Sequence, residues 1–259
     1  MTQVILIRGG GDLATGAAVR LHRAGFNILI TELPAPMAVR RTVSFSEAVY
    51  DGEITVEGVT ARRADSPEEA FQLLEKKLIP VLVDPGLEIL KLNKFQCLID
   101  ARLLKRDSDT DIHFAPLVIG FGPGFTCGVN CHAVIETKRG HDLGRVFWSG
   151  SASPDTGQPD GDQRRVLRAP EDGKITCHVE IASYVEEGQP VAETAGIPII
   201  APFGGILRGL IRPGLMVKKG VKIGDIDQRN ERAYCFTVSD KALAIGGAVL
   251  EAMLTHVNV

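Results

Sequence analysis

The sequence has little that points to nucleic acid or to a membrane. Its 259 residues include 29 Lys and Arg against 32 Asp and Glu, a net charge of −3, so no basic excess would attract a polyanion. No apolar run approaches the roughly twenty residues of a membrane-spanning helix, and the N-terminus begins with a predicted strand in place of a signal peptide. We therefore expect no nucleic-acid partner and no membrane contact.

Disulfide bonds are not expected either. The five cysteines are odd in number and scattered, which fits a reducing cytoplasm better than a disulfide framework. We therefore predict a cytoplasmic protein. With 44% hydrophobic residues, the chain is long enough for one large domain and a small one.

The first half of the chain is organised around the stretch from Val4 to Glu32, which has the pattern strand, glycine turn, helix, strand. An unbroken apolar run opens it, as in a strand buried on both faces of a parallel sheet. The turn then follows the G-x-G-x-x-A spacing, in which the second glycine lets a pyrophosphate approach the backbone and the small third residue lets helix and strand pack closely. The predicted phosphate-binding residues are Gly9, Gly10, Gly11, Asp12 and Ala14. The alternative is a purely structural glycine turn.

Charged residues complete this predicted site. Asp12 lies at the helix start, where its carboxylate can cap free N–H groups and so compete with a phosphate. Glu32 ends the second strand near the distance at which an acidic side chain accepts ribose hydroxyls. Arg40 and Arg41 follow in a loop, where a guanidinium could hold a phosphate through two parallel hydrogen bonds, although a solvated basic loop explains them equally well.

Strand and helix patterns alternate through the first hundred residues. Ser66 and Pro67 open one predicted helix, and the apolar runs 79–83 and 96–100 predict two further strands. This alternation favours an α/β fold with a Rossmann-like doubly wound parallel sheet, whose ligand lies at the carboxyl ends of the strands. We assign residues 1–150 to a nucleotide- or cofactor-binding domain of this kind.

A second glycine-rich loop follows a predicted strand that ends at Ile119. Its glycines include Gly122 and Gly124, and the conformational entropy that glycines lose there indicates that a ligand approaches the backbone. The candidate catalytic side chains of this region are Cys127, Cys131, His132 and His141. Reactive thiols and ordinary buried cysteines both remain open, and His141 is either a proton carrier or a hydrogen-bonded turn residue. We expect no metal site, because the spacing matches none of the standard zinc patterns.

Residues 166–229 contain an internal repeat with a constant offset of 32 residues; for example, Gly188 matches Gly220. Each half reads as short strands separated by glycine turns, so the halves should interlock into a small all-β sandwich. The elements A-P-x-x-G and V-x-x-G-x-x-[VI] resemble those of the biotinyl/lipoyl-like (barrel-sandwich hybrid) domains. That resemblance implies a prosthetic group on a lysine of the central hairpin, but the hairpin 194–198 has no lysine, so we expect a docking or covering module.

Residues 230–259 are predicted to close the chain as a strand and a helix. The helix begins at Ser239 and Asp240. Its small residues, Ala244, Gly246, Gly247 and Ala248, would let it lie very close to another element, which we expect to be the first domain.

Six blocks of sequence together resemble the selenium-dependent molybdenum hydroxylase system accessory family, also labelled YqeB-like. The blocks are RGGGDLATG (8–16), LHRAGF (21–26), AVRRTVSFSEAVYDG (38–52), GFGPGFTCG (120–128), ETKRGHDLGRV (136–146) and GSASPDTG (150–157). The resemblance spans essentially the whole chain. It implies a role in maturing molybdenum hydroxylases and a kinship of the N-terminal domain with the Rossmann part of xanthine dehydrogenase maturation factors, and it supplies no established catalytic residue.

Three functions follow as hypotheses. The first is a maturation factor that binds a small anionic cofactor, either an NAD-like nucleotide or a phosphate-bearing pterin such as the molybdenum cofactor, with a molybdenum hydroxylase as partner. The second is an NAD(P)-dependent oxidoreductase, although no Tyr-x-x-x-Lys or comparable proton-transfer pair is visible in the first 150 residues. The third is a non-catalytic adaptor that docks through the β-sandwich domain. We also expect a homo-oligomer, and whether the chain is an enzyme stays open.

Overall fold

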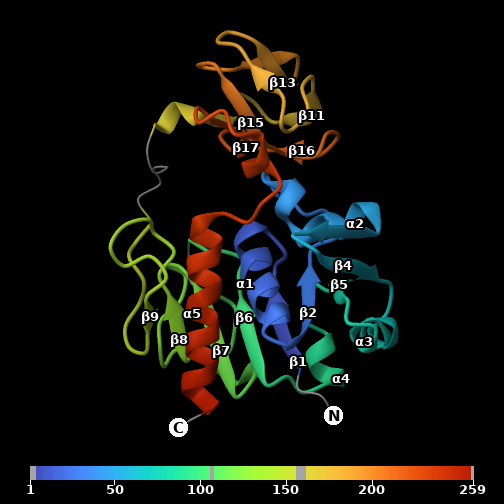
Figure 1. Cartoon of the computed structure of the whole chain (residues 1–259), viewed down its shortest axis with the longest axis vertical. Coiled ribbons are helices and arrows are strands. Elements are labelled where there is room, and N and C mark those ends of the chain that lie inside the picture. The colour runs from blue at the N-terminus through green and yellow to red at the C-terminus, as the bar shows by residue number, and fades with distance from the viewer. Residues whose placement is uncertain (1–3, 106–107, 156–161, 258–259) are drawn as a thin grey trace. The chain divides into compact units, whose positions relative to one another are not determined.

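The structure of the protein, a computed structural model, describes residues 4–105, 108–155 and 162–257, and the chain divides into two compact units (Figure 1). Unit 1 comprises Met1–Pro36, Ser44–Thr156 and Val238–Val259, and unit 2 comprises Met37–Val43 and Gly157–Thr237. Each unit therefore takes residues from separate parts of the sequence.

Unit 1 is built on a nine-stranded mixed sheet in the order β3-β4-β5-β2-β1-β6-β7-β8-β9. Its strands are β1 (Val4–Arg8), β2 (Asn27–Glu32), β3 (Glu53–Val56), β4 (Val59–Ala64), β5 (Ile79–Val83), β6 (Cys97–Asp100), β7 (Leu117–Phe121), β8 (Ala133–Ile135) and β9 (Val146–Phe147). From β4 to β8 all neighbours are parallel, whereas β3 and β9 pair antiparallel at the two edges. The apolar run of β1 is central, since Ile5, Leu6 and Ile7 are fully buried.

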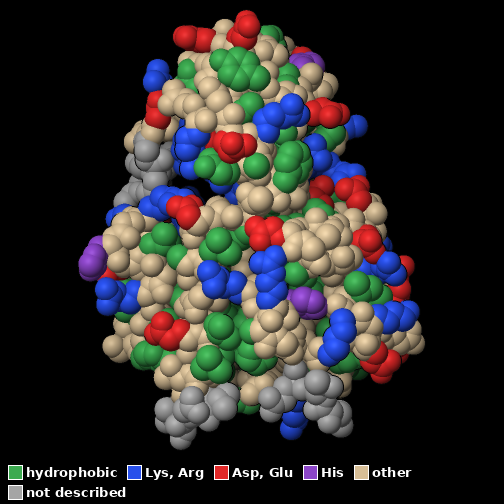
Figure 2. All heavy atoms as spheres, viewed as in Figure 1, with side chains coloured by type: hydrophobic (Ala, Val, Ile, Leu, Met, Phe, Trp, Pro, Cys, Tyr) green, Lys and Arg blue, Asp and Glu red, His purple; other side chains and the backbone are tan. Residues whose placement is uncertain are grey.

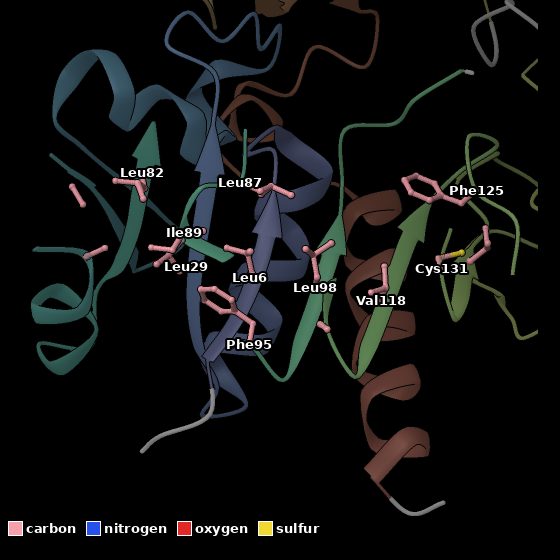
Figure 3. Packing of buried hydrophobic residues seen from close by; sticks show 14 of the residues in the cluster. Leu6, Leu29, Leu82, Leu87, Ile89, Phe95, Leu98, Val118, Phe125 and Cys131 are labelled. Carbon is pink, nitrogen blue, oxygen red and sulfur yellow. The ribbon is translucent and has the colours of Figure 1, made fainter. Parts of the chain in front are cut away.

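Helices lie on both faces of this sheet. The α-helices are α1 (Asp12–Arg23), α2 (Ala48–Asp51), α3 (Pro67–Glu75), α4 (Ile89–Leu92) and α5 (Asp240–Val257), and the short 3-10 helices are η1 (Arg41–Val43), η2 (Phe45–Glu47), η3 (Ile112–Phe114), η4 (Gln163–Arg165) and η5 (Arg232–Cys235). α1 packs on α5, while residues of α3 and α4 join a core that includes Leu6, Leu29, Leu98 and Val118. Figure 3 shows these four side chains along the strands, with α5 behind the strands of Leu98 and Val118. Within the described residues, none of the helices combines the length and apolar character that crossing a membrane would require.

Small residues let α1 and α5 approach closely. A Cβ added to Gly16 of α1 would lie 2.6 Å from Cβ of Ala242, and one added to Gly246 would lie 2.9 Å from the carbonyl oxygen of Gly16. No larger side chain fits at either position without moving backbone. α5, which comes from the C-terminal end of the chain, is thereby seated against the helix that follows the first glycine turn.

The expected fold class is wrong for unit 1. The sheet is mixed, not a Rossmann-like doubly wound parallel sheet, because hairpin turns add an antiparallel strand at each edge. Glu57 and Gly58, with φ of 48° and 80°, reverse the chain between β3 and β4. The segment 122–132 between β7 and β8 contains no helix, and α5 contacts β7, β8 and β9 in its place. The alternating sequence of residues 53–63, with Glu57 and Gly58 at the turn, predicts an exposed hairpin, but not that this hairpin extends the large sheet.

The second part of the predicted fold class, the small barrel-sandwich hybrid, is also wrong. Unit 2 has two four-stranded antiparallel sheets, β10-β17-β15-β12 and β14-β13-β11-β16, where a small barrel-sandwich hybrid was expected. Its strands are β10 (Val166–Arg168), β11 (Gly173–Cys177), β12 (Tyr184–Val185), β13 (Pro190–Thr194), β14 (Ile197–Ile200), β15 (Gly205–Leu210), β16 (Met216–Val217) and β17 (Lys222–Asp227). η5 occupies part of the segment 230–239, where a strand was expected.

The sequence repeat reappears in these strands. β11, β12 and β13 begin 32 residues before β15, β16 and β17, respectively. β11 of the first half pairs with β16 of the second, and β15 of the second pairs with β12 of the first. Each half therefore completes the sheet of the other, and one shared core, which includes Ile175, Val191, Leu207 and Ile223, is buried between them.

Candidate functional site

The sheet of unit 1 reverses its order at β1. From β1 the chain proceeds through β2 to β5 on one side, and only then crosses to β6 on the other. In open α/β sheets, ligands bind outside the carboxyl ends of the strands at such a reversal. We use the name β1/β6 edge for residues 8–11, which end β1 and form the glycine turn, together with residues 100–102 and 108–110, which follow β6.

Gly10, in the middle of the turn, is covered by the protein itself. Its N–H donates to Oε2 of Glu32 at 2.6 Å, and its carbonyl accepts from the N–H of Ser46 at 2.9 Å. A Cβ at Gly10 would lie 2.9 Å from that same Ser46 nitrogen. Its polar backbone groups are thus used inside the fold, and Gly10 is a packing glycine. Gly9, with φ of 92°, makes the bend itself.

Gly11, by contrast, is open. It is the N-cap residue of α1, it has no side chain to cap the helix, and no atom of the described chain lies within 4 Å of where its Cβ would be. Asp12 begins α1, and Ala14 is fully buried, as close packing of the helix requires. The N-terminus of α1 therefore lies at the β1/β6 edge with open space beside Gly11, and the positive end of a helix favours anions.

Glu32 lies beside the turn, and its carboxylate is hydrogen-bonded to the main chain. Its two carboxylate oxygens accept the N–H groups of Gly10 and Leu33, at 2.6 and 2.7 Å. Burial raises the pKa of Glu32, and those two hydrogen bonds only partly oppose the rise. A carboxylate has about four lone-pair sites, so Glu32 keeps acceptor capacity for ligand hydroxyls.

Arg40 and Arg41 belong to unit 2. Arg40 is 8% exposed and donates to the carbonyls of Tyr234 and Thr237 at 2.8 and 3.1 Å, and Nε of Arg41 donates to the carbonyl of Leu210 at 3.2 Å. Their guanidinium groups therefore stabilise the main chain of unit 2. The predicted role as phosphate ligands beside Glu32 has no support in these contacts.

The second glycine loop follows β7 at the same carboxyl edge of the sheet. Gly122 has φ of 81°, and a Cβ there would lie 2.9 Å from Oγ1 of Thr137. The carbonyl of Gly124 accepts from the N–H of Ser108 at 3.1 Å, which ties this loop to the segment after β6. Gly122 therefore has a packing reason for its presence, whereas the contact of Gly124 is one that the backbone of any residue could make.

Of the four candidate catalytic residues, Cys127 and Cys131 lie together, with their thiols in contact. Cys131 is fully buried in the core beside Val118, and burial, with Cys127 nearby, raises its pKa to about 12. His132, the next residue, turns to the opposite face, as successive residues of an extended chain do, and its ring lies 6.4 Å from that of His256 on α5.

The remaining contacts of these residues are structural. Nδ1 of His132 accepts from the N–H of Val118 at 2.9 Å, and its pKa is lowered by burial and by neighbouring histidines. Sγ of Cys127 donates to the carbonyl of Phe147 at 3.2 Å, and burial raises its pKa. His141 is exposed in the turn that begins at Gly140. Apart from the contact of Cys127 with Cys131, these contacts join the four side chains to other parts of the fold. The described residues include no cluster of His, Cys, Asp or Glu able to hold a metal ion.

Sequence reasoning missed the most strongly charged part of the β1/β6 edge. Arg8 and Asp100 are register partners at the last positions of β1 and β6, and both are buried. Nη1 and Nη2 of Arg8 donate to the two carboxylate oxygens of Asp109 at 2.9 and 3.0 Å. Nε of Arg102 donates to Asp100 at 2.9 Å, and Thr110 donates to Asp100 at 2.6 Å.

Electrostatics hold Asp109 ionised. Burial alone would raise the pKa of Asp109, but hydrogen bonds from Arg8 and Arg102 outweigh it and lower the pKa to about 2. The available signal in the sequence was a charged residue directly after each of two buried apolar strands, Arg8 after 4–7 and Asp100 after 97–99. Polar side chains at the carboxyl ends of neighbouring parallel strands converge on one edge.

Comparison with known proteins gives one relative over the whole chain. No protein-family model matches the sequence. The uncharacterized protein YqeB of Escherichia coli is 49% identical over 263 residues, which cover 99% of this chain and 49% of that protein. The match supports the YqeB-like label, and the chain spans about half the length of the curated relative that it matches.

Solved structures are similar only at a low level. An aspartoacylase family protein (mlr6093) from Mesorhizobium loti has 12% identity and a TM-score of 0.26, with 87% of this chain and 85% of that chain covered. The apo ectoine utilization protein EutE (DoeB) of Ruegeria pomeroyi has 10% identity and a TM-score of 0.27, with 88% and 86% covered. The succinylglutamate desuccinylase/aspartoacylase of Rhodobacter sphaeroides has 15% identity and a TM-score of 0.27, with 88% and 85% covered. We draw no inference about this chain from likeness of this degree.

Proposed function

We propose that unit 1 binds a small anionic cofactor at the β1/β6 edge, and that the chain acts as a cytoplasmic accessory factor in the maturation of a molybdenum hydroxylase of the selenium-dependent kind. The observation that carries the proposal is the open N-terminus of α1 at Gly11, three residues after the buried guanidinium of Arg8. Two positively polarised groups on one short turn favour a ligand that carries negative charge.

The geometry favours an elongated ligand. Arg8 follows Leu6 by two positions in β1, so its side chain lies on the same face of the sheet as the core on the α3 side, whereas α1 lies on the other face. The Cα atoms of Arg8 and Gly11 are at most about 11 Å apart along the chain. A phosphate at the N-terminus of α1 and a second anionic group near Arg8 would place one molecule across the edge. An NAD-like nucleotide or a phosphate-bearing pterin such as the molybdenum cofactor has this extended, doubly charged form.

The maturation role rests on the sequence relationship. The blocks shared with the YqeB-like family lie mostly in unit 1, and the relative in Escherichia coli is 49% identical over 263 residues. All five cysteines are free, the state that thiols take in a reducing compartment. We propose a molybdenum hydroxylase as the protein partner, because delivery of a cofactor requires contact with its recipient.

Equilibrium binding to the purified chain tests the cofactor site. Isothermal titration with NAD, adenine nucleotides and a molybdopterin-type ligand should show one site, and Gly11→Val should weaken binding about tenfold or more, because the side chain would occupy the ligand's place at the amides. Gly11 has φ of −66°, so valine adds no backbone strain. Gly247→Ala on α5, also in open space, is the matched control. Equal affinity of the Gly11→Val variant and the wild type would refute the site.

Co-purification separates the proposed role from its alternatives. A tagged chain that retains a cofactor and captures a hydroxylase subunit supports a maturation factor. Capture without any bound small molecule would support the adaptor instead. Turnover of a reduced nicotinamide cofactor would support the oxidoreductase, which requires a proton-transfer pair.

A further inference from the structure

The side chains of Arg8 and Asp109 form an unequal pair. The side chain of Arg8 is 9% exposed, whereas that of Asp109 is 65% exposed, although its two oxygens meet Arg8 in a bidentate arrangement. Nη2 of Arg102 also donates to Asp109 at 2.5 Å. A solvent-exposed carboxylate thus closes over two guanidinium groups at the β1/β6 edge.

Asp109 is not needed to hold Arg102 in place. Asp100, fully buried, accepts two hydrogen bonds from Nε of Arg102 and one from its Nη2, and it also accepts from Thr110. The pair Asp100–Arg102 therefore satisfies itself within the fold. Nη1 of Arg8 lies 3.8 Å from Oδ2 of Asp100, which is too far for a hydrogen bond. The carboxylate that accepts two hydrogen bonds from Arg8 is that of Asp109. Without Asp109 the four-residue cluster would carry one net positive charge.

We propose that Asp109 occupies the subsite of an anionic group, and that a phosphoryl or carboxylate group of the ligand displaces it on binding. The inference rests on the proposed function and adds to it a second anionic subsite with an internal competitor. A guanidinium presents the same two parallel donors to a carboxylate and to a phosphoryl group. Because the side chain of Asp109 is exposed, its carboxylate can move into solvent, and a ligand anion would restore the two hydrogen bonds that the buried Arg8 loses.

The subsite is continuous with the glycine turn. A Cβ on Gly9 would lie 3.2 Å from Cγ of Arg102, so the arginine stem lies directly against the bend that leads to Gly11. An anion held by Arg8 and Arg102 is therefore next to the turn. In the wild type the ligand must compete with Asp109 for this subsite. The apparent affinity is therefore the intrinsic affinity multiplied by the fraction of molecules in which Asp109 is displaced.

Inorganic pyrophosphate is the probe for this subsite. In isothermal titration at fixed ionic strength, Asp109→Asn should bind pyrophosphate about tenfold more tightly than the wild type, because the competing charge is gone. Asp111→Asn is the matched control, since Asp111 is the next acidic residue, with its carboxylate accepting from the N–H of His113. It removes the same charge from the same segment. An equal effect of both variants, or no effect of Asp109→Asn, would overturn the inference.

A second substitution links the gain to the buried guanidinium. Arg8→Lys in the Asp109→Asn background should remove the gain, because an ammonium cannot donate two parallel hydrogen bonds. Retention of the gain would contradict the assignment to Arg8. The proposed function is refuted separately. If Gly11→Val leaves nucleotide binding unchanged, the cofactor site is refuted. If Gly11→Val abolishes nucleotide binding but Asp109→Asn brings no gain, only the displacement of Asp109 is refuted.

Discussion

The N–H of Gly10 donates to Oε2 of Glu32 across 2.6 Å, and this bond joins the glycine turn after β1 to the end of β2. Gly10 is thereby withdrawn from any ligand, while its neighbour Gly11 stays open. A glycine turn that matches a cofactor-binding spacing can thus use one of its glycines for packing and another for access.

Replacement of Glu32 should change how stability depends on pH. Burial raises the pKa of Glu32 in the folded state above the ordinary 4.5, so the folded state binds this proton more tightly than the unfolded state does. Relative to the Glu32→Gln variant, the wild type should therefore gain free energy of unfolding as pH falls from neutral to 4.5, with no further gain below. Urea unfolding at several pH values measures the difference. A difference that shrinks on acidification would contradict the burial of this carboxylate.

The contact of α1 with α5 should not tolerate a methyl group at Gly16. Gly16→Ala would place Cβ 2.6 Å from Cβ of Ala242 and 2.9 Å from its carbonyl, so the variant should lose about 2 kcal/mol of unfolding free energy despite its better helix propensity. Fluorescence of Trp148, the single tryptophan and a residue of unit 1, follows the transition. Gly247→Ala, which meets no atom within 4 Å, should be neutral or stabilising.

Gly120 of β7 should be equally intolerant, for a different reason. A Cβ there would lie 2.1 Å from Cγ of the fully buried Phe125 ring. Gly120→Ala should cost about 3 kcal/mol by overpacking, and Phe125→Ala should also destabilise by leaving a cavity. Because the two changes share one space, the double variant should lose less than the sum of the two, as measured by urea unfolding. Simple additivity would show that the ring does not pack on this glycine.

Cys131 should be inert toward alkylation in the folded protein. Its thiol is fully buried and burial, with Cys127 nearby, raises its pKa to about 12, so almost no thiolate is present at pH 8. Iodoacetamide followed by peptide mass spectrometry should find Cys131 unmodified until urea is added, and the partly exposed Cys127 modified slowly. Rapid labelling of Cys131 in native protein would restore it as a candidate reactive thiol.

Local features of the fold could be predicted from the sequence. Ser66 accepts from the N–H of Glu69 with Pro67 in the first turn of α3, as the cap pattern indicates, and the hairpin turn at Glu57 and Gly58 forms where it was expected. Each of these depends on residues a few positions apart. The mixed sheet could not be predicted from such local patterns, because β3 and β9 belong to it only through the parallel pairings of β4 with β5 and of β8 with β7.

The same limit explains the site. The spacing identified the turn and its open glycine, but Asp109 meets Arg8 from 101 positions away, and no periodic pattern relates them. Arg40 follows Glu32 closely in sequence, yet its guanidinium binds carbonyls near the other end of the chain, at Tyr234 and Thr237. Cys131 and His132, adjacent in sequence, point to opposite faces because side chains alternate along an extended strand.

Native mass spectrometry of the full chain, purified gently from cells that express a molybdenum hydroxylase, tests the central claim most directly. We predict that the wild type carries an added mass of one phosphate-bearing small molecule, that Gly11→Val loses it, and that Gly247→Ala keeps it. A wild-type chain with no added mass, or an added mass that persists in Gly11→Val, would contradict a cofactor site at the β1/β6 edge.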